Sequence, residues 1–262
     1  MNLMTVSGLR ARWVGLLTLG GALTISAAPL AAQQADSLIA SPVRPSHPMT
    51  VRWYHAAAVV GGTSLLLLVD APVKRFAQDN RTSTTDDAAR FFRHFGQPEV
   101  YATVSLGLVG AGLVAGKPEL ARMGGRAVGS VGLAGASTLA LKALFGRPRP
   151  NQGGPVVDFD PFGASEGLPS GHSAVAFALA TSLAQDIHRT WATVALYTLA
   201  TGTAWSRIDQ NEHWLSDVAL GAAIGITSAK LASGRWQMFG IRTPSFLLTP
   251  TGAPALGWHA NF

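Results

Sequence analysis

The chain has 262 residues, a formal net charge of +6 and a hydrophobic fraction of 48%, whereas only 13% of its residues are charged. This balance is more apolar than that of a typical soluble domain and indicates a protein in or near a membrane. The absence of cysteine excludes disulfides, thiolate chemistry and Cys-ligated metals, and the lack of a dense basic run with interleaved aromatic residues argues against nucleic acid as a partner.

The first 32 residues have the layout of a secretory signal. Two arginines precede an apolar run from Val14 to Ile25, and small residues follow up to Ala32. We therefore expect residues 1–32 to be a signal peptide that is cleaved near Ala32, and the protein to be exported. An uncleaved membrane anchor is the alternative, because Leu30 occupies the position three before the proposed cut.

The rest of the chain divides into three parts. Residues 33–54 contain several prolines and no apolar periodicity, so we expect a linker. Residues 55–234 should form a helical domain, in which Val73–Phe95 is a charged, amphipathic surface segment. The apolar helices of this domain are predicted at His55–Val69, Val100–Ala115, Arg126–Phe145, Ser173–Ile187, Thr190–Ser206 and Asp217–Ala232.

Residues 235–262 change in character and are predicted to be a C-terminal extension. Several prolines and glycines precede an alternation of apolar residues from Leu256 to Phe262, which is typical of a strand. We expect a small β-hairpin that packs on the helices. The fold class predicted is all-α, a bundle of about six core helices with the active site at one end, plus this hairpin.

The predicted helices are marginal as membrane spans. A run of about 16 residues covers roughly 24 Å, less than the roughly 30 Å of the hydrocarbon core. Three spans before Arg149 would also place an exported enzyme's site in the cytoplasm. We therefore favour a periplasmic bundle that docks on a membrane, with an integral bundle as the close alternative, because short spans can thin the bilayer.

The first cluster of chemical interest is cationic. Lys142 lies near the end of an apolar helix, and a glycine and two prolines then force an extended loop that carries Arg147 and Arg149. Arginine offers a planar fork and lysine a movable charge to a phosphate. A solvated helix end or a membrane-interface cap would look similar, and Arg147 could either bind the anion or neutralise nearby acids.

The second cluster is Pro169-Ser170-Gly171-His172, which precedes a run of small and apolar residues. Ser170 is expected to cap a helix whose first backbone N–H groups cradle an anion. Gly171 allows close approach, and His172 could donate a proton to a leaving oxygen. An ordinary capped helix with an interface histidine is the alternative.

The third cluster joins Ser206-Arg207 to His213 and Asp217. We expect Arg207 to close one helix, and His213 and Asp217, four residues apart, to share a face of the next helix, which Asn211 could cap. A carboxylate on one imidazole nitrogen leaves the other free to attack phosphorus. A helix-surface His–Asp pair is the alternative.

The three clusters together resemble the three-part signature of the type 2 phosphatidic acid phosphatase family, whose superfamily also holds vanadium-dependent haloperoxidases and bacterial acid phosphatases. The matching residues are Lys142-x6-Arg149-Pro150, Pro169-Ser170-Gly171-His172 and Ser206-Arg207-x5-His213-x3-Asp217. The resemblance covers about residues 55–234. Asn211 stands where many members have glycine, and Asn tolerates the left-handed backbone that such a turn needs; Asp209 and Glu212 make the loop more acidic than an anion site favours.

The resemblance implies roles for each matching residue. Lys142, Arg149 and Arg207 would bind the phosphate, with hydrogen bonds from Ser170 and Gly171. His213 would be the nucleophile, Asp217 would orient it, and His172 would act as general acid and then as base. A phosphohistidine would form between the two steps, and neither a metal nor another cofactor is implied.

The sequence therefore predicts a metal-independent hydrolase that cleaves a lipid phosphate or pyrophosphate at a membrane surface or in the bilayer. Acid phosphatase activity on soluble phosphomonoesters is the nearest alternative. Vanadate-dependent halide oxidation is another, because the same cations could hold vanadate, although the chain is short for it. A membrane scaffold that binds lipid without turnover is the non-catalytic alternative. The sequence does not indicate an oligomeric state.

Overall fold

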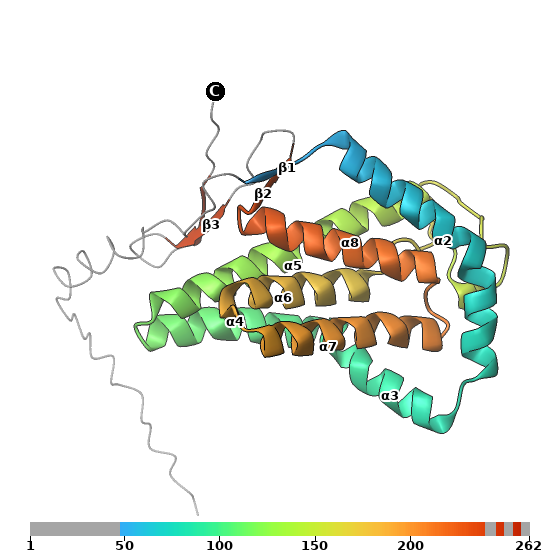
Figure 1. The fold of residues 1–262 in the computed structure, drawn as a ribbon, viewed down its shortest axis with the longest axis horizontal. Coiled ribbons are helices and arrows are strands. Elements are labelled where there is room, and N and C mark those ends of the chain that lie inside the picture. Colours follow the sequence, from blue (N-terminus) through green and yellow to red (C-terminus); the bar gives the residue numbers. More distant parts are fainter. Residues whose placement is uncertain (1–47, 239–244, 249–253, 258–262) are drawn as a thin grey trace, which may run out of the picture.

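The structure is a computed structural model that describes residues 48–238, 245–248 and 254–257 (Figure 1). The expected signal peptide and most of the expected linker lie outside the described residues. The elements are β1 (Met49–Val51), α2 (Trp53–Asp79), α3 (Ser83–Arg93), the 3₁₀ turn η1 (His94–Gly96), α4 (Pro98–Val114), α5 (Pro118–Phe145), the 3₁₀ turn η2 (Pro150–Gln152), α6 (Gly171–Ile187), α7 (Thr190–Asp209), α8 (Leu215–Ala232), β2 (Trp236–Met238), β3 (Ser245–Leu248) and β4 (Pro254–Gly257).

Helix α6 lies at the centre of the bundle. Every residue from Ser173 to Leu183 is buried, and α5, α7 and α8 surround it (Figure 1). The core on this helix consists largely of alanine with a few larger residues such as Leu179 and Phe177. Small side chains let the helix backbones approach closely, so the bundle is held by tight packing around one helix rather than by large side chains.

The contact between α6 and α8 depends on glycine at two positions. A Cβ atom on Gly221 would lie 2.5 Å from the carbonyl oxygen of Ser170, and one on Gly225 would lie 2.3 Å from that of Ala174. Both distances are shorter than real Cβ contacts allow, so α8 can approach the start of α6 only with glycine there. This approach brings the second and third sequence clusters together.

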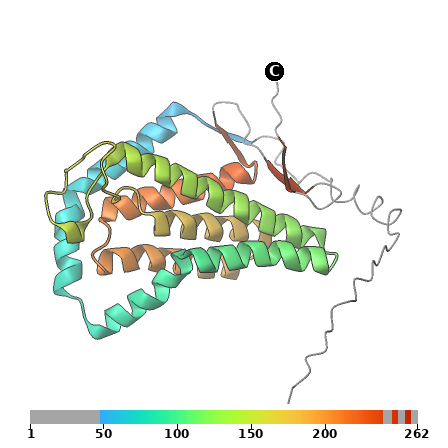
Figure 2. The same cartoon turned by 180° about the vertical axis from the view of Figure 1, so that it is seen from behind.

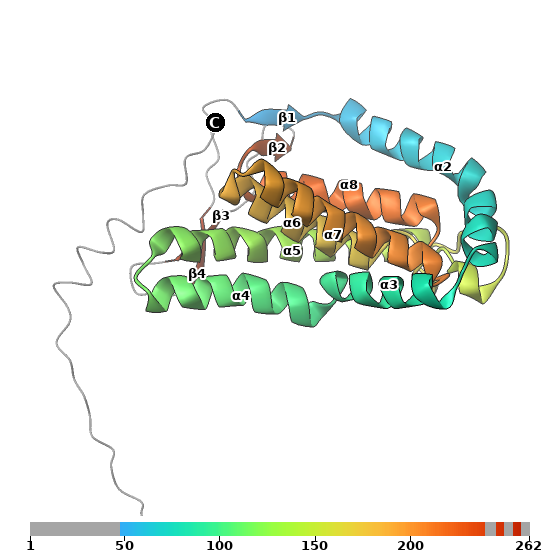
Figure 3. The ribbon, with the colours of Figure 1, turned by 60° about the horizontal axis from the view of Figure 1, so that its bottom comes forward.

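The remaining helices pack around this core. Helix α4 packs on α5, α3 packs on α7, and α2 packs on α8; Figure 3 shows α3 and α4 on the same side of the bundle, and the later part of α2 across its end. Seen from behind, the loop after α5 lies at that same end, beside α2 (Figure 2). One end of the bundle is thus built from segments far apart in the sequence.

Two small sheets accompany the helices. Strand β1 pairs in parallel with β2, and β3 pairs antiparallel with β4 in the register Ser245 to Gly257. The prediction of an all-α bundle with a small C-terminal β-hairpin is confirmed, and β3 contacts α5. Strand β1 was not predicted, and because it and the start of α2 fall within 33–54, the last part of the expected linker has regular structure.

Three helices in the described part of the chain are long and apolar enough to cross a membrane: α2, α5 with its continuation to Gln152, and α8. The expectation of marginal lengths is wrong for the first two. Helix α2 has 27 residues and α5 has 28, which correspond to about 40 Å each at 1.5 Å per residue. They are longer than predicted because α2 continues through Pro72 and α5 begins at Pro118.

Candidate active site

The residues of the three sequence clusters meet at one end of the bundle. Lys142 lies in the last turn of α5, Ser170 caps α6, Arg207 lies in the last turn of α7, and Asp217 lies in the first turn of α8. The loop with Arg149 connects the first two of these elements at the same end (Figure 1). Four helix ends and two loops therefore supply the predicted site residues.

The start of α6 is fixed by its own cap and by α8. The Ser170 hydroxyl accepts hydrogen bonds from Ser173, at 3.5 Å from N and 3.0 Å from Oγ, as its expected role as N-cap requires. Its backbone N–H donates to the carbonyl oxygen of Asp217 at 3.0 Å. A Cβ atom on Gly171 would lie 3.7 Å from the Thr138 methyl, an ordinary contact. Protein packing alone therefore does not require glycine at Gly171.

His213 and Asp217 lie side by side, but not as two residues of one helix. Helix α8 begins at Leu215 with Trp214 as N-cap, so His213 precedes the helix and the expected cap at Asn211 is wrong. Asn211 instead adopts the left-handed conformation, with φ of 58°. The Asp217 carboxylate accepts from the backbone N–H of Trp214 at 2.9 Å and so caps its own helix.

The imidazole of His213 is buried and neutral. Its Nδ1 lies 3.5 Å from Oδ2 of Asp217 and makes no hydrogen bond, because that distance is too long for a good one. Burial lowers the pKa of His213, and the Asp217 carboxylate raises it without reversing the shift. A neutral ring with a carboxylate on its Nδ1 side keeps the lone pair of the other nitrogen available for attack.

His172 is also neutral in the free protein. Burial lowers the pKa of its imidazole to about 3, and the neighbouring Arg207, His213, Arg93 and Arg149 act in the same direction. The hydrogen bond from Ser170 N to Asp217 O joins the second and third clusters, and the influence of His213 and Arg207 on this ring agrees with that proximity. A group with such a low pKa can serve as a general acid only if a bound anion raises its pKa.

The three predicted phosphate-binding cations are bridged by carboxylates. Glu212 bonds to Arg149 and lies 3.5 Å from Arg207 Nη2. Glu166 Oε2 lies 4.0 Å from both Lys142 Nζ and Arg149 Nη2. The structure thus gathers the three cations, and two acids lie where an anion would compete for them.

A buried ion network behind the site was not predicted. Arg147 has no exposed surface; its Nη1 donates to Asp217 Oδ1 at 2.6 Å and its Nη2 donates to Asp70 Oδ2 at 2.8 Å. Arg147 therefore neutralises acids, which was one of its two expected roles, and holds the carboxylate beside His213. The oxygens of Asp70 also accept from Ser216, at 2.9 Å from N and 2.5 Å from Oγ.

Asp70 and Ser216 were missed because Asp70 belongs to no motif and Ser216, although it lies between His213 and Asp217, is not one of the residues that the third cluster specifies. Asp70 lies in an apolar stretch of α2, where it is the only buried residue of the helix. A lone acid within a membrane-length apolar segment is itself a signal of function, since its charge needs a buried partner. That signal could have identified Asp70 but not its partner.

Across the described residues, no group of three or more His, Asp or Glu side chains is placed to hold a metal ion.

Residues 124–240 match the family model described as PAP2 superfamily. The chain is 42% identical over 106 residues to a lipid A 1-phosphatase from Porphyromonas gingivalis, an alignment that covers 40% of this chain and 21% of that protein. The chain thus matches only about a fifth of this curated relative.

Two solved structures share the fold. LpxE from Aquifex aeolicus superposes with a TM-score of 0.50 at 23% identity, over 62% of this chain and 92% of the other. A transmembrane PAP2 type phosphatidylglycerolphosphate phosphatase from Bacillus subtilis superposes with a TM-score of 0.52 at 18% identity, over 67% and 92%. At these identities the likeness concerns the fold of the helical bundle.

Proposed function

We propose, on the premise that the chain carries a PAP2 superfamily region at residues 124–240, that the protein is a membrane-associated phosphatase of a lipid phosphate or pyrophosphate. The observation that supports the proposal is that His213, next to Asp217, lies at the same end of the bundle as Lys142, Arg149 and Arg207, which Glu166 and Glu212 bridge. A phosphate dianion needs such cations, and its cleavage needs a nucleophile.

The proposed reaction has two steps. The ring nitrogen of His213 away from Asp217 attacks phosphorus, the phosphorus–oxygen bond to the leaving group breaks, and the leaving oxygen takes the electron pair. The cations neutralise the charge on the remaining oxygens, assisted by the Ser170 hydroxyl and the backbone N–H of Gly171. Water then attacks the phosphohistidine and releases inorganic phosphate, which restores the free imidazole. No metal takes part in this proposal.

The role of His172 depends on the bound phosphate. Its pKa of about 3 leaves the ring neutral in the free protein, but a phosphate dianion among the same cations would offset their repulsion and raise the pKa. His172 would then protonate an alkoxide leaving group in the first step. In the second step it would accept a proton from the attacking water.

We propose a lipid as the substrate class because large apolar side chains are exposed on the outside of the bundle. In helix α2, Leu65 is 67% exposed and Leu68 is 76% exposed, and three helices can cross a membrane by length and composition. The similarity to a protein named lipid A 1-phosphatase agrees with a phosphorylated lipid. We further propose that the protein is exported and that the site opens on the periplasmic side.

The test is phosphate release by purified protein in detergent, with phosphatidate and a polyprenyl pyrophosphate as substrates and glycerol 3-phosphate as the soluble comparison. We expect turnover of a lipid substrate and a loss of about 10⁴-fold or more in kcat for His213→Ala, as for other nucleophiles. His55→Ala, at the far end of α2, is the matched control. Release that is unchanged in His213→Ala would exclude the proposed mechanism, and activity on glycerol 3-phosphate alone would exclude the lipid substrate.

A further inference from the structure

Arg93, the last residue of α3, lies on the face of that helix that packs against the bundle. Ala89, four residues earlier, has no exposed surface, and Gly96, three residues later, is buried. Ala89 and Arg93, four residues apart in α3, lie only about 40° apart around the helix. A Cβ atom on Gly96 would lie 2.9 Å from the carbonyl oxygen of His172 and 3.0 Å from its Cβ. The segment that directly follows Arg93 therefore packs against His172 at the start of α6, where the site is.

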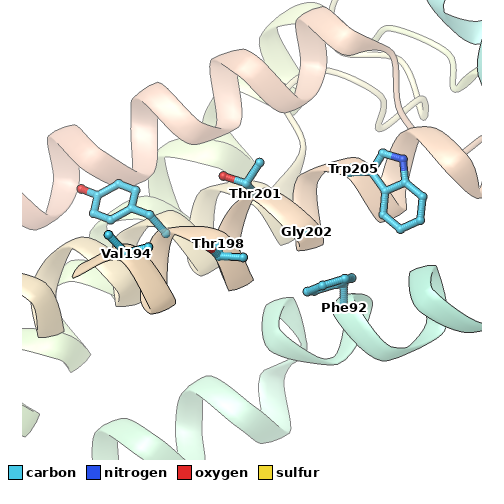
Figure 4. Close-up of a pocket in the computed structure, with 7 residues that line it drawn as sticks. Phe92, Val194, Thr198, Thr201, Gly202 and Trp205 are labelled. Atoms are coloured by element: carbon cyan, nitrogen blue, oxygen red, sulfur yellow. The ribbon is translucent and has the colours of Figure 1, made fainter. Parts of the chain in front are cut away.

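The packing of α3 on α7 fixes this direction. The Thr203 hydroxyl donates to the carbonyl oxygen of Phe92 at 2.9 Å, and a Cβ atom on Gly202 would lie 2.3 Å from the Phe92 ring. Figure 4 shows Phe92 across from Gly202 and Trp205. These residues line an apolar groove that contains none of the predicted site residues, together with Val194, Tyr197, Thr198 and Thr201.

The groove and the site lie on different faces of α7. Trp205 and Arg207 are two residues apart, which is about 200° around a helix. Phe92 occupies the groove side, and Arg93 is the next residue around α3. Arg93 lies about 100° further around α3 and does not line the groove.

The guanidinium of Arg93 lacks a partner within the described part of the chain. Its Nε is buried and makes no hydrogen bond, and no carboxylate lies within ion-pair distance of it there. By contrast, Arg90 on the same helix pairs with Asp87, and Arg149 and Arg207 both contact Glu212. An unsatisfied buried N–H is costly, and a ligand oxygen would satisfy it.

Electrostatic effects show on which side of the site Arg93 lies. Burial is the main cause that lowers the pKa of His172, and Arg93 adds to it. Burial likewise lowers the pKa of Arg207 to about 10, with Arg93 again contributing. For His213, burial is again the main cause, and Lys142 and Arg207 are the cations that lower its pKa further. Arg93 thus lies on the side of His172, the residue proposed to act on the leaving group.

We propose that Arg93 forms a second anion subsite, on the leaving-group side of the phosphate site, which takes the inner phosphate of a lipid diphosphate. The inference rests on the proposed function and narrows its substrate class. Arg93 lies outside the three clusters that match the family signature, so it is a specificity-determining residue of this chain.

The chemistry of a diphosphate fits this arrangement. When His213 attacks the terminal phosphorus, the bond from that phosphorus to the bridging oxygen breaks, and the bridging oxygen leaves with the electron pair as part of a lipid monophosphate. A phosphate ester with a second pKa near 6 leaves as an anion without being protonated first. Stabilisation of that charge by Arg93 then replaces proton transfer from His172, whose ring is neutral in the free protein.

The test compares farnesyl diphosphate with farnesyl monophosphate, which share the same chain, in the wild type, Arg93→Gln and Arg93→Lys. Loss of a charged hydrogen bond should lower kcat/KM for the diphosphate by about tenfold or more. The value for the monophosphate should change less than about threefold, and Arg93→Lys should recover part of the loss. Arg90→Gln, an exposed arginine one turn earlier, is the matched control.

Binding measurements separate this inference from the proposed function. Calorimetric titration of inorganic pyrophosphate and inorganic phosphate requires no turnover. Arg93→Gln should weaken pyrophosphate binding by about tenfold and leave phosphate binding within about threefold. Equal weakening of both anions, or no weakening, would overturn the inference. Absence of phosphate release by the wild type from either farnesyl substrate would instead overturn the proposed function.

Discussion

At the scale of single residues, a carboxylate of the protein contacts the cations that are proposed to bind the phosphate. Glu212 contacts Arg149 and Arg207, two of the proposed phosphate ligands. A phosphate must therefore compete with a carboxylate that is already present. We predict that Glu212→Gln binds phosphate several-fold more tightly, because the competing charge is removed while the shape is kept.

The measurement for Glu212→Gln is the inhibition constant of inorganic phosphate against a lipid substrate. Glu119→Gln is the control, since Glu119 is an exposed acid in the first turn of α5, at the opposite end of that helix from Lys142. Weaker inhibition in Glu212→Gln would show that Glu212 instead holds the arginines in their binding geometry.

A second prediction at this scale concerns acid stability. Burial lowers the pKa of His172 to about 3, whereas an unfolded histidine titrates near 6.5. Between these values the unfolded chain binds the additional proton, so the stability contributed by neutral His172 is complete above about pH 6.5 and is lost as the pH falls toward 3. We predict a falling melting temperature from pH 7 to pH 5 and a shallower fall for His172→Gln. Parallel curves for the two proteins would refute the low pKa.

The residues predicted from the sequence were those that local patterns define. Ser170 could be assigned as a cap from its neighbours, and the left-handed backbone of Asn211 was expected from its residue type. Asp70 and Arg93 could not be assigned in this way. Their relation to the site follows from the docking of α2 on α8 and of α3 on α7, which no short sequence window records.

At the scale of elements, α2 is coupled to the site through one buried acid. Asp70 accepts hydrogen bonds from Arg147 and from Ser216 at the start of α8. Removing one partner of a buried ion pair costs about 3–5 kcal/mol. We predict that Asp70→Asn lowers the melting temperature clearly and also lowers kcat, because Arg147 and Asp217 lose part of their support.

Asp79→Asn is the control for Asp70→Asn, since Asp79 is an exposed acid at the end of the same helix. Thermal unfolding in detergent and steady-state kinetics are the two measurements. Equal melting temperatures for the two variants would contradict a stabilising role of the Asp70 network. An unchanged kcat with a lower melting temperature would show that the Asp70 network stabilises the fold but does not support catalysis.

The boundaries of α2 and α8 show why elements were harder to predict than motifs. The segment after Pro72 is charged and reads as a separate surface helix, yet it continues α2. Lys74 Nζ donates to Pro150 O at 2.8 Å, and Gln78 Nε2 donates to Asp209 O at 3.0 Å. Tertiary contacts with the site loops thus stabilise the additional turns of α2.

The start of α8 was misplaced because His213 lies in the preceding loop and Asp217 provides a cap from within the first turn.

At the scale of the whole molecule, the bundle has an apolar exterior and a polar end. Helix α2 buries only Asp70, while large apolar side chains such as Leu65 and Leu68 are mostly exposed. This surface suits lipid rather than water. We therefore predict a protein that stays with the membrane fraction after alkaline carbonate washing and is released by detergent.

The orientation of the bundle can be tested because the chain has no cysteine. Asn151 lies at the site end, after α5, and Lys117 precedes the first turn of the same helix. We predict that a membrane-impermeant maleimide applied to intact cells with a permeable outer membrane labels Asn151→Cys but not Lys117→Cys. Labelling of Lys117→Cys alone would place the site in the cytoplasm and contradict export of the site.

The central claim is that His213 becomes phosphorylated during turnover. The most direct measurement is a rapid quench of the wild-type protein with a lipid substrate carrying a labelled terminal phosphate, followed by peptide mapping under alkaline conditions. We predict an acid-labile phosphate on His213 within one turnover and none in His213→Ala. Turnover without any phosphate on His213, or with the label on another residue, would contradict it.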